Sequence, residues 1–253
     1  MELKDAYSIV ELMEREELLI RQVPPQAAWL VENFGAKIEI QGLKNHYGLL
    51  SFIGDGFDIL GYVSDKIIVD GGAYIGDSTF VYGATTPCKF VAAFEVDKNN
   101  IEKLKENTMA LESQGKVKIY KKALSSEKRK CFINESNEIS LNTRFAETGE
   151  PVKCIDLDSL DLGEIGYIKL DIEGAEVPAI YGMQKTIEKY RPALSIAMYH
   201  NTQQMYTIAG NIGSWLRQFG YITQIRRLQY DSPVCEIYLQ AFPKISNFCS
   251  FVV

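Results

Sequence analysis

The segment that constrains the fold most runs from Lys66 to Ser78 and reads KIIVDGGAYIGDS. Its β-branched apolar run ends in Asp70 and the pair Gly71-Gly72, which is typical of a buried strand followed by a turn with positive φ angles. After Gly76 come residue types that cap and open a helix. A strand, a glycine turn and a helix N-terminus together form a pocket for a nucleotide-like ligand at the carboxyl edge of a parallel sheet.

Length and charge narrow the class of protein. A chain of 253 residues suits one large α/β domain, so we expect a helical or cap segment over 1–65 and the main domain over 66–253. The net charge of −6 disfavours nucleic acid as a partner, because a phosphate backbone needs a basic face. No apolar run reaches membrane-spanning length and the N-terminus does not read as a signal peptide, so we expect no membrane contact and a cytoplasmic location.

The five cysteines, at positions 88, 131, 154, 235 and 249, are widely spread. They form no Cys-x-x-Cys pair, so neither a zinc site nor a disulfide framework is expected. Reduced thiols are the simplest interpretation.

Strand and helix patterns alternate regularly from residue 66 onward. Further strands are expected over 89–95, 117–124, 152–157, 166–172 and 193–199, and helices begin at Asp97, at Gly174 and near Met205. The polar region 131–151 is expected to be a loop or hairpin beside the site. Helices over 3–21 and 25–35 are expected to pack on or beside the sheet, with a pocket cover or a dimer contact as the alternative.

Two strands over 222–230 and 234–242 close the chain, and the short connection between them permits only antiparallel neighbours. A parallel α/β sheet that ends in an antiparallel hairpin is similar to the fold of class I S-adenosylmethionine (SAM) methyltransferases. We therefore expect a Rossmann-like, seven-stranded mixed sheet with a C-terminal hairpin and N-terminal helices.

The glycine turn favours SAM over a nicotinamide dinucleotide. Gly71, Ala73 and Gly76 stand where a dinucleotide fingerprint has three glycines, so the middle glycine is absent. Asp70 would repel a pyrophosphate but suits the ammonium group of an amino-acid moiety. The alternative is a glycine turn that binds nothing.

Acids end two further strands. Glu95 stands where a carboxylate accepts hydrogen bonds from the two hydroxyls of an adenosine ribose. Lys169, Asp171 and Glu173 place three charges within five residues, and burying several carboxylates together is costly unless they serve a ligand. His200 directly follows the strand over 193–199 and is expected at the same sheet edge.

The segments 69–78, 93–97 and 168–176 together resemble the FkbM family of SAM-dependent methyltransferases, and the resemblance covers roughly residues 66 to 200. It implies O-methylation of hydroxyls on sugars, polysaccharides or polyketide-type natural products. It also implies SAM binding and a reactive site at matching positions, namely Asp70, Gly72, Gly76 and Glu95 for SAM, and Lys169, Asp171 and Glu173 for the site. Tyr74 stands where the general methyltransferase turn has a small residue and where many members of the FkbM family have asparagine.

We therefore predict a SAM-dependent O-methyltransferase that acts on a small-molecule or glycan acceptor. The predicted SAM-binding residues are Asp70, Gly71, Gly72, Ala73, Tyr74, Gly76, Ser78, Glu95, Val96, Ala123, Leu124 and Asp171. The predicted catalytic residues are Lys169, Asp171, Glu173 and His200. Asp171 and Glu173 compete with His200 for the role of base or bind the substrate or a metal, and no dedicated metal ligands are predicted. An NAD-dependent oxidoreductase and a non-catalytic scaffold are the alternatives, and a homodimer is left open.

Overall fold

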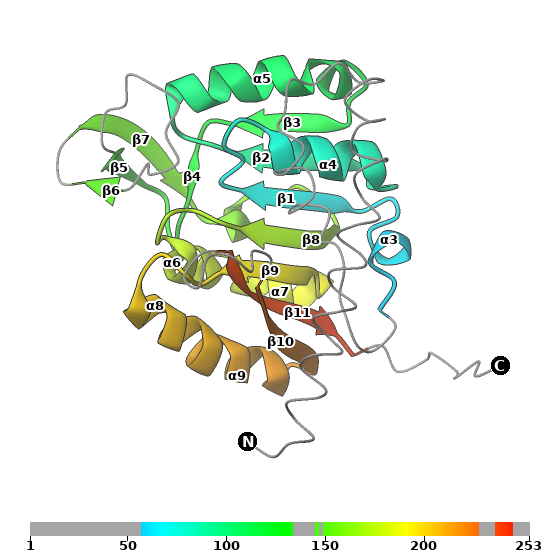
Figure 1. Cartoon of the computed structure of the whole chain (residues 1–253), viewed down its shortest axis with the longest axis vertical. Helices are drawn as coiled ribbons and strands as arrows, with labels where there is room; N and C mark the ends of the chain where they lie inside the picture. The colour runs from blue at the N-terminus through cyan, green and yellow to red at the C-terminus, as the bar shows by residue number, and fades with distance from the viewer. Residues whose placement is uncertain (1–56, 134–144, 147–148, 228–235, 245–253) are drawn as a thin grey trace.

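The computed structural model describes residues 57–133, 145–146, 149–227 and 236–244 (Figure 1). The helices expected over 3–21 and 25–35 lie outside these residues, and the predicted domain boundary at residue 65 stays a prediction. No described helix has both the length and the apolar character that crossing a bilayer requires.

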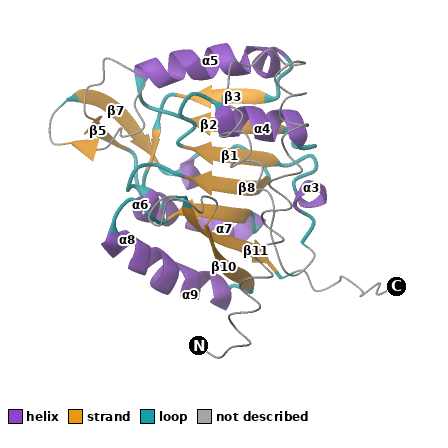
Figure 2. Cartoon of the chain, in the orientation of Figure 1, coloured by secondary structure: helices purple, strands orange, loops and turns teal. Residues whose placement is uncertain are grey.

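Seven strands form one mixed sheet in the order β10-β11-β9-β8-β1-β2-β3 (Figure 2). They are β1 (Ile67–Gly71), β2 (Phe90–Phe94), β3 (Val117–Tyr120), β8 (Ile165–Leu170), β9 (Ala193–Ala197), β10 (Tyr221–Arg227) and β11 (Ile237–Pro243). Strands β3, β2, β1, β8 and β9 run parallel, whereas β11 lies antiparallel between β9 and β10. The predicted seven-stranded mixed sheet with an antiparallel C-terminal pair is confirmed.

Apolar side chains alternate between two cores, one on each face of this sheet. In β1, Ile67 and Val69 enter a core that also contains side chains of α6, α7, η2 and α9. Ile68 enters the opposite core, with side chains of α3, α4 and α5. Because successive side chains of a strand point to opposite faces, a short run of β-branched residues supplies both cores at once.

The helices follow the expected pattern in outline. Those on one face are α3 (Ile59–Tyr62), α4 (Asp77–Thr85) and α5 (Lys98–Ser113), and those on the other are α6 (Glu176–Tyr181), α7 (Gln184–Tyr190), α8 (Thr202–Tyr206) and α9 (Gly213–Gln218). A π-helical segment, η2 (Thr207–Ile212), joins α8 to α9, and a 3-10 turn, η1 (Leu157–Ser159), precedes β8. The predicted N-cap at Asp97 is confirmed, since its side chain accepts hydrogen bonds from the N–H groups of Asn99 and Asn100.

A second sheet of four strands stands beside the large one, in the order β4-β7-β5-β6. Its strands are β4 (Ala123–Leu124), β5 (Arg129–Ile133), β6 (Phe145–Ala146) and β7 (Glu150–Ile155). The prediction of one strand over 117–124 was wrong, because the chain leaves the large sheet after Tyr120 and Ala123–Leu124 pairs with β7. The region over 131–151, expected as a loop or hairpin, therefore contains strands of this second sheet.

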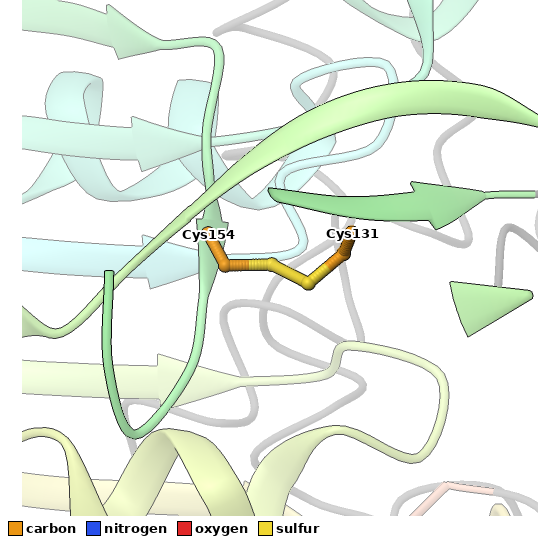
Figure 3. The surroundings of a disulfide bond; sticks show 2 residues. All are labelled: Cys131 and Cys154. Atoms are coloured by element: carbon orange, nitrogen blue, oxygen red, sulfur yellow. A yellow bond between two sulfur atoms is a disulfide. The ribbon is translucent and has the colours of Figure 1, made fainter. Parts of the chain in front are cut away.

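A disulfide joins Cys131 of β5 to Cys154 of β7 (Figure 3). The expectation of reduced thiols was wrong for this pair. The antiparallel register places Cys131 opposite Val152 and Arg129 opposite Cys154, so the two cysteines occupy diagonal positions with their Cα atoms 6.4 Å apart. This proximity depends on the register of two strands, which cysteine spacing alone does not reveal. Cys88 is a buried free thiol.

Candidate active site

A cavity of about 210 Å³ lies where β1, β2 and β8 end, and the second sheet forms one of its walls. The predicted site residues that line it are Gly72, Tyr74, Glu95, Val96, Ala123, Leu124, Lys169, Asp171 and Glu173. The other predicted residues do not line the cavity, namely Asp70, Gly71, Ala73, Gly76, Ser78 and His200. The fold thus brings three separate sequence motifs to one cavity.

The glycine turn after β1 packs closely against the start of the loop after β8. Gly72 has φ 75°, and a Cβ atom there would lie 1.8 Å from the carbonyl oxygen of Asp171. Gly76 has φ 92°, and a Cβ atom there would lie 2.7 Å from Cδ1 of Leu104. Any side chain at Gly72 would therefore force the two loops apart.

Asp70 braces this turn from inside the protein. Its fully buried carboxylate accepts 2.6 Å hydrogen bonds from the hydroxyls of Ser78 and Thr79 and lies 3.3 Å from Nζ of Lys169. The same Nζ donates a 2.7 Å hydrogen bond to the carbonyl oxygen of Gly72. Burial lowers the pKa of Lys169, but the charge of Asp70 outweighs it and the pKa is raised. In this structure Asp70 faces Lys169 and the helix start, not the cavity.

Glu95 is held by the backbone of two loops. Oε2 accepts a 2.8 Å hydrogen bond from the N–H of Tyr74, and Oε1 accepts hydrogen bonds of 2.7 and 2.9 Å from the N–H groups of Val96 and Asp97. Burial raises the pKa of Glu95, and the three N–H donors oppose that effect. The carboxylate is therefore fixed in orientation at the wall of the cavity.

Asp171, which follows β8, lines the cavity and lies among tyrosine hydroxyls. The hydroxyl of Tyr199 lies 3.0 Å from both carboxylate oxygens, and that of Tyr238 donates a 2.9 Å hydrogen bond to Oδ2. Burial raises the pKa of Asp171, but His200 and Lys169 outweigh it and lower the pKa. Asp171 is therefore an ionised carboxylate.

His200 lies behind Asp171 and is surrounded by carboxylates. Its side chain is 4% exposed, with Nε2 3.3 Å from Oδ1 of Asp171 and 3.6 Å from Oε1 of Glu173, while Nδ1 lies 3.0 Å from Oε1 of Glu176. Burial lowers the pKa of His200, but these carboxylates outweigh it and raise the pKa to about 12. Glu176 also accepts hydrogen bonds from the N–H groups of Ile172 and Gly174.

Several lining residues were missed from the sequence. They are Asp77, Phe94, Asn100, Lys122, Ile133, Ile172, Ala175, Tyr199 and Glu236. Tyr199 precedes His200 at the end of a parallel strand. The reasoning that placed His200 at the carboxyl edge of the sheet therefore applies to Tyr199 as well. Glu236 comes from the segment before β11 and has no comparable signal, because the insertion of β11 between β9 and β10 is a feature of the tertiary structure.

The strand order, the antiparallel C-terminal pair and the cavity at the carboxyl edge define the class I methyltransferase fold. The family model described as the methyltransferase FkbM domain matches residues 70–223, and the chain belongs to this family. No protein of curated function is significantly similar to it in sequence.

Two solved structures are similar to this chain at low sequence identity. Methyltransferase FkbM from Methylobacillus flagellatus KT is 18% identical with a TM-score of 0.57, and the match covers 87% of this chain and 59% of that one. A protein from Streptococcus mutans, solved in complex with SAH, is 14% identical with a TM-score of 0.49, and the match covers 73% of this chain and 93% of that one. This chain thus spans less than two thirds of the length of the Methylobacillus protein.

Proposed function

We propose that the protein is a SAM-dependent O-methyltransferase whose acceptor is a hydroxyl of a sugar, polysaccharide or other natural product. Membership of the FkbM family supports methyl transfer. The observation that carries the proposal is that one cavity joins two chemically different ends. Glu95, which follows β2, and Leu124 of β4 define one end, and Asp171, Glu173 and Tyr199, which follow β8 and β9 on the other side of β1, define the other.

The first end suits the adenosine part of SAM. A carboxylate has about four acceptor sites, and backbone N–H groups use three on Glu95, which leaves capacity for a ribose hydroxyl. Phe94, Leu124 and Ile133 supply apolar surface for an adenine ring. Lys169 and Asp70 hold the glycine turn in place and so shape the part of the cavity next to Gly72.

The second end suits the reacting groups. SAM, when bound, supplies an activated methyl group, whose transfer forms an O–C bond to the acceptor, breaks the C–S bond and leaves S-adenosylhomocysteine (SAH). The acceptor hydroxyl must lose its proton to a nearby base. Among the described lining residues, Asp171 and Glu173 are the predicted bases that reach the cavity. Asp171 accepts hydrogen bonds from two tyrosines, and Glu173 lies 3.6 Å from Nε2 of His200. We assign the role of proton acceptor to Glu173 because its side chain is the more exposed of the two, at 23% against 17%.

Binding of SAH to the purified protein, measured by calorimetry, tests this function, and release of SAH from SAM with a panel of glycan and small-molecule acceptors tests the transfer. Saturable SAH binding with an acceptor-dependent release of SAH is the expected result. Binding of NADH without SAH would favour the oxidoreductase alternative. Binding of neither would favour a non-catalytic scaffold.

The cytoplasmic location and the homodimer remain predictions from the sequence. The Cys131–Cys154 disulfide argues against a reducing compartment, since such bonds persist mainly in oxidising surroundings.

A further inference from the structure

We propose that Asp171, Glu176 and His200 form a binding site for one divalent transition-metal ion. One potential ligand atom from each residue lies within 4.8 Å of the other two. Asp171 follows β8, Glu176 begins α6 and His200 lies just after β9, so the tertiary fold gathers the three.

The charge in this cluster favours the binding of a cation. The carboxylates of Asp171, Glu173 and Glu176 surround a single imidazole. Glu176 is fully buried, and its Oε2 has no hydrogen-bond partner among the residues that the structure describes. Burying several carboxylates around one imidazole costs free energy unless a further positive charge compensates them.

The geometry at His200 is that of neighbouring metal ligands. Two ligands about 2.1 Å from one ion lie about 3.0–3.4 Å apart when the angle between them is near 90–109°. Nε2 lies 3.3 Å from Oδ1 of Asp171, and Nδ1 lies 3.0 Å from Oε1 of Glu176. Within the described part of the chain, however, neither nitrogen makes an aligned hydrogen bond. Oxygens close to a ring nitrogen but off its axis leave room for an ion on that axis.

The histidine ring also has the surroundings typical of a metal ligand. Only one of its two nitrogens can bind a given ion, and in metal sites the other nitrogen usually donates to a carboxylate. Here each ring nitrogen has a carboxylate beside it, Asp171 on one side and Glu176 on the other. An ion on one nitrogen has the carboxylate beside that nitrogen as its fellow ligand, and the carboxylate beside the other nitrogen orients the ring.

The donor set selects the class of ion. Imidazole nitrogen together with carboxylate oxygen suits Mn²⁺, Fe²⁺ or Zn²⁺, whereas Mg²⁺ and Ca²⁺ prefer sites made only of oxygen. Because Asp171 lines the cavity, such an ion would lie beside the acceptor end and could lower the pKa of an acceptor hydroxyl. That role rests on the proposed function, whereas binding of the ion does not.

The test uses the full chain, freed of metal by a chelator and dialysed against Mn²⁺ or Zn²⁺, with the bound ion measured by mass spectrometry. One ion per chain is expected. Glu176→Gln and His200→Gln should each weaken binding by at least about tenfold. Glu164→Gln is the matched control, because it removes an exposed carboxylate that pairs with Lys66 away from the cluster. This variant should bind the ion as the wild type does.

A second measurement guards against variants that fail to fold. At one metal concentration, bound metal should raise the Tm of the wild type and of Glu164→Gln by similar amounts, and that of Glu176→Gln by clearly less. Less than one ion per chain at saturating metal, or unchanged binding by both cluster variants, would overturn the proposal. SAH calorimetry on the metal-free protein separates the two proposals. If the wild-type protein takes up one metal ion but does not bind SAH, the result counts only against the proposed function.

Discussion

The backbone N–H of Tyr74 donates a 2.8 Å hydrogen bond to Oε2 of Glu95. This bond ties the glycine turn after β1 to the end of β2, so the two loops that meet the cavity share one carboxylate. Tyr74 adopts φ 48°, a left-handed conformation that is uncommon for residues with a side chain. The bond to Glu95 helps to hold that conformation.

Replacing the Glu95 carboxylate should weaken the binding of SAM and SAH. In Glu95→Gln the amide has fewer acceptor sites than the backbone donors and a ribose together require. We expect roughly 10–100-fold lower affinity for SAH, because hydrogen bonds to a charged group are worth about 1.5–3 kcal/mol. Calorimetry measures the change, with Glu102→Gln on the exposed face of α5 as the control. An affinity equal to that of the wild type would contradict the assignment of Glu95.

Binding of SAH should also weaken in mild acid. Burial raises the pKa of Glu95, so the folded protein takes up this proton at a higher pH than an unfolded glutamate does, and the ionised acceptor is lost as pH falls through the raised pKa. The loss should therefore begin above the ordinary glutamate range near about 4.3. Calorimetry across a pH series checks this, and the decline should be flatter in Glu95→Gln. An equally steep decline in that variant would assign the effect to another group.

The buried pair of Lys169 and Asp70 should show strong coupling in stability. Lys169→Met leaves the Asp70 carboxylate without its cation and Gly72 without its donor, and removal of one partner of a buried pair costs about 3–5 kcal/mol. Adding Asp70→Asn should restore part of the lost free energy of unfolding. Urea denaturation of both single variants and the double variant measures this coupling. Strictly additive losses would show that the two groups do not interact.

The disulfide should stabilise the second sheet. It closes a loop with a sequence separation of 23, and the loss of such a link typically costs about 2–4 kcal/mol. Cys131→Ser with Cys154→Ser should lower the free energy of unfolding by that amount and make the protein insensitive to reductant. Because Ile133 and Leu124 line the cavity from this sheet, SAH affinity should fall as well. Wild-type protein whose stability does not respond to reductant would contradict the prediction.

Glu173→Gln should slow methyl transfer without weakening SAH binding. Loss of a general base typically costs about 10²–10⁴-fold in rate. The rate of SAH release with a productive acceptor measures the effect, and SAH calorimetry shows whether the cofactor end is intact. A rate close to that of the wild type would move the role of base to Asp171.

Much of the parallel part of the fold was predictable from local patterns. The run Ile67–Gly71, the turn to Gly76 and the N-cap at Asp97 all appear in the structure where the sequence placed them. These features depend on backbone preferences of neighbouring residues, which act within a few positions of the chain. The shared carboxyl edge then follows, because parallel strands end on the same side of a sheet.

The second sheet and the partners of the charged groups were not predictable in this way. The chain turns out of the large sheet after Tyr120, where a 2.9 Å bond joins the N–H of Lys122 to the carbonyl oxygen of Tyr120. The disulfide depends on the register of β5 against β7, and the sequence pattern does not specify that register. Asp70 illustrates the same limit, because its residue type suited a ligand whereas its burial gave it Lys169 as a partner.

The sequence alone was sufficient to predict a parallel α/β sheet, a glycine turn at its carboxyl edge and acids gathered near that turn. Short-range backbone preferences and strand direction account for all three. The tertiary structure alone determines which acids line the cavity, which support the turn and which surround His200. Desolvation makes a buried charge dependent on its nearest partner, and those partners come from strands distant in sequence.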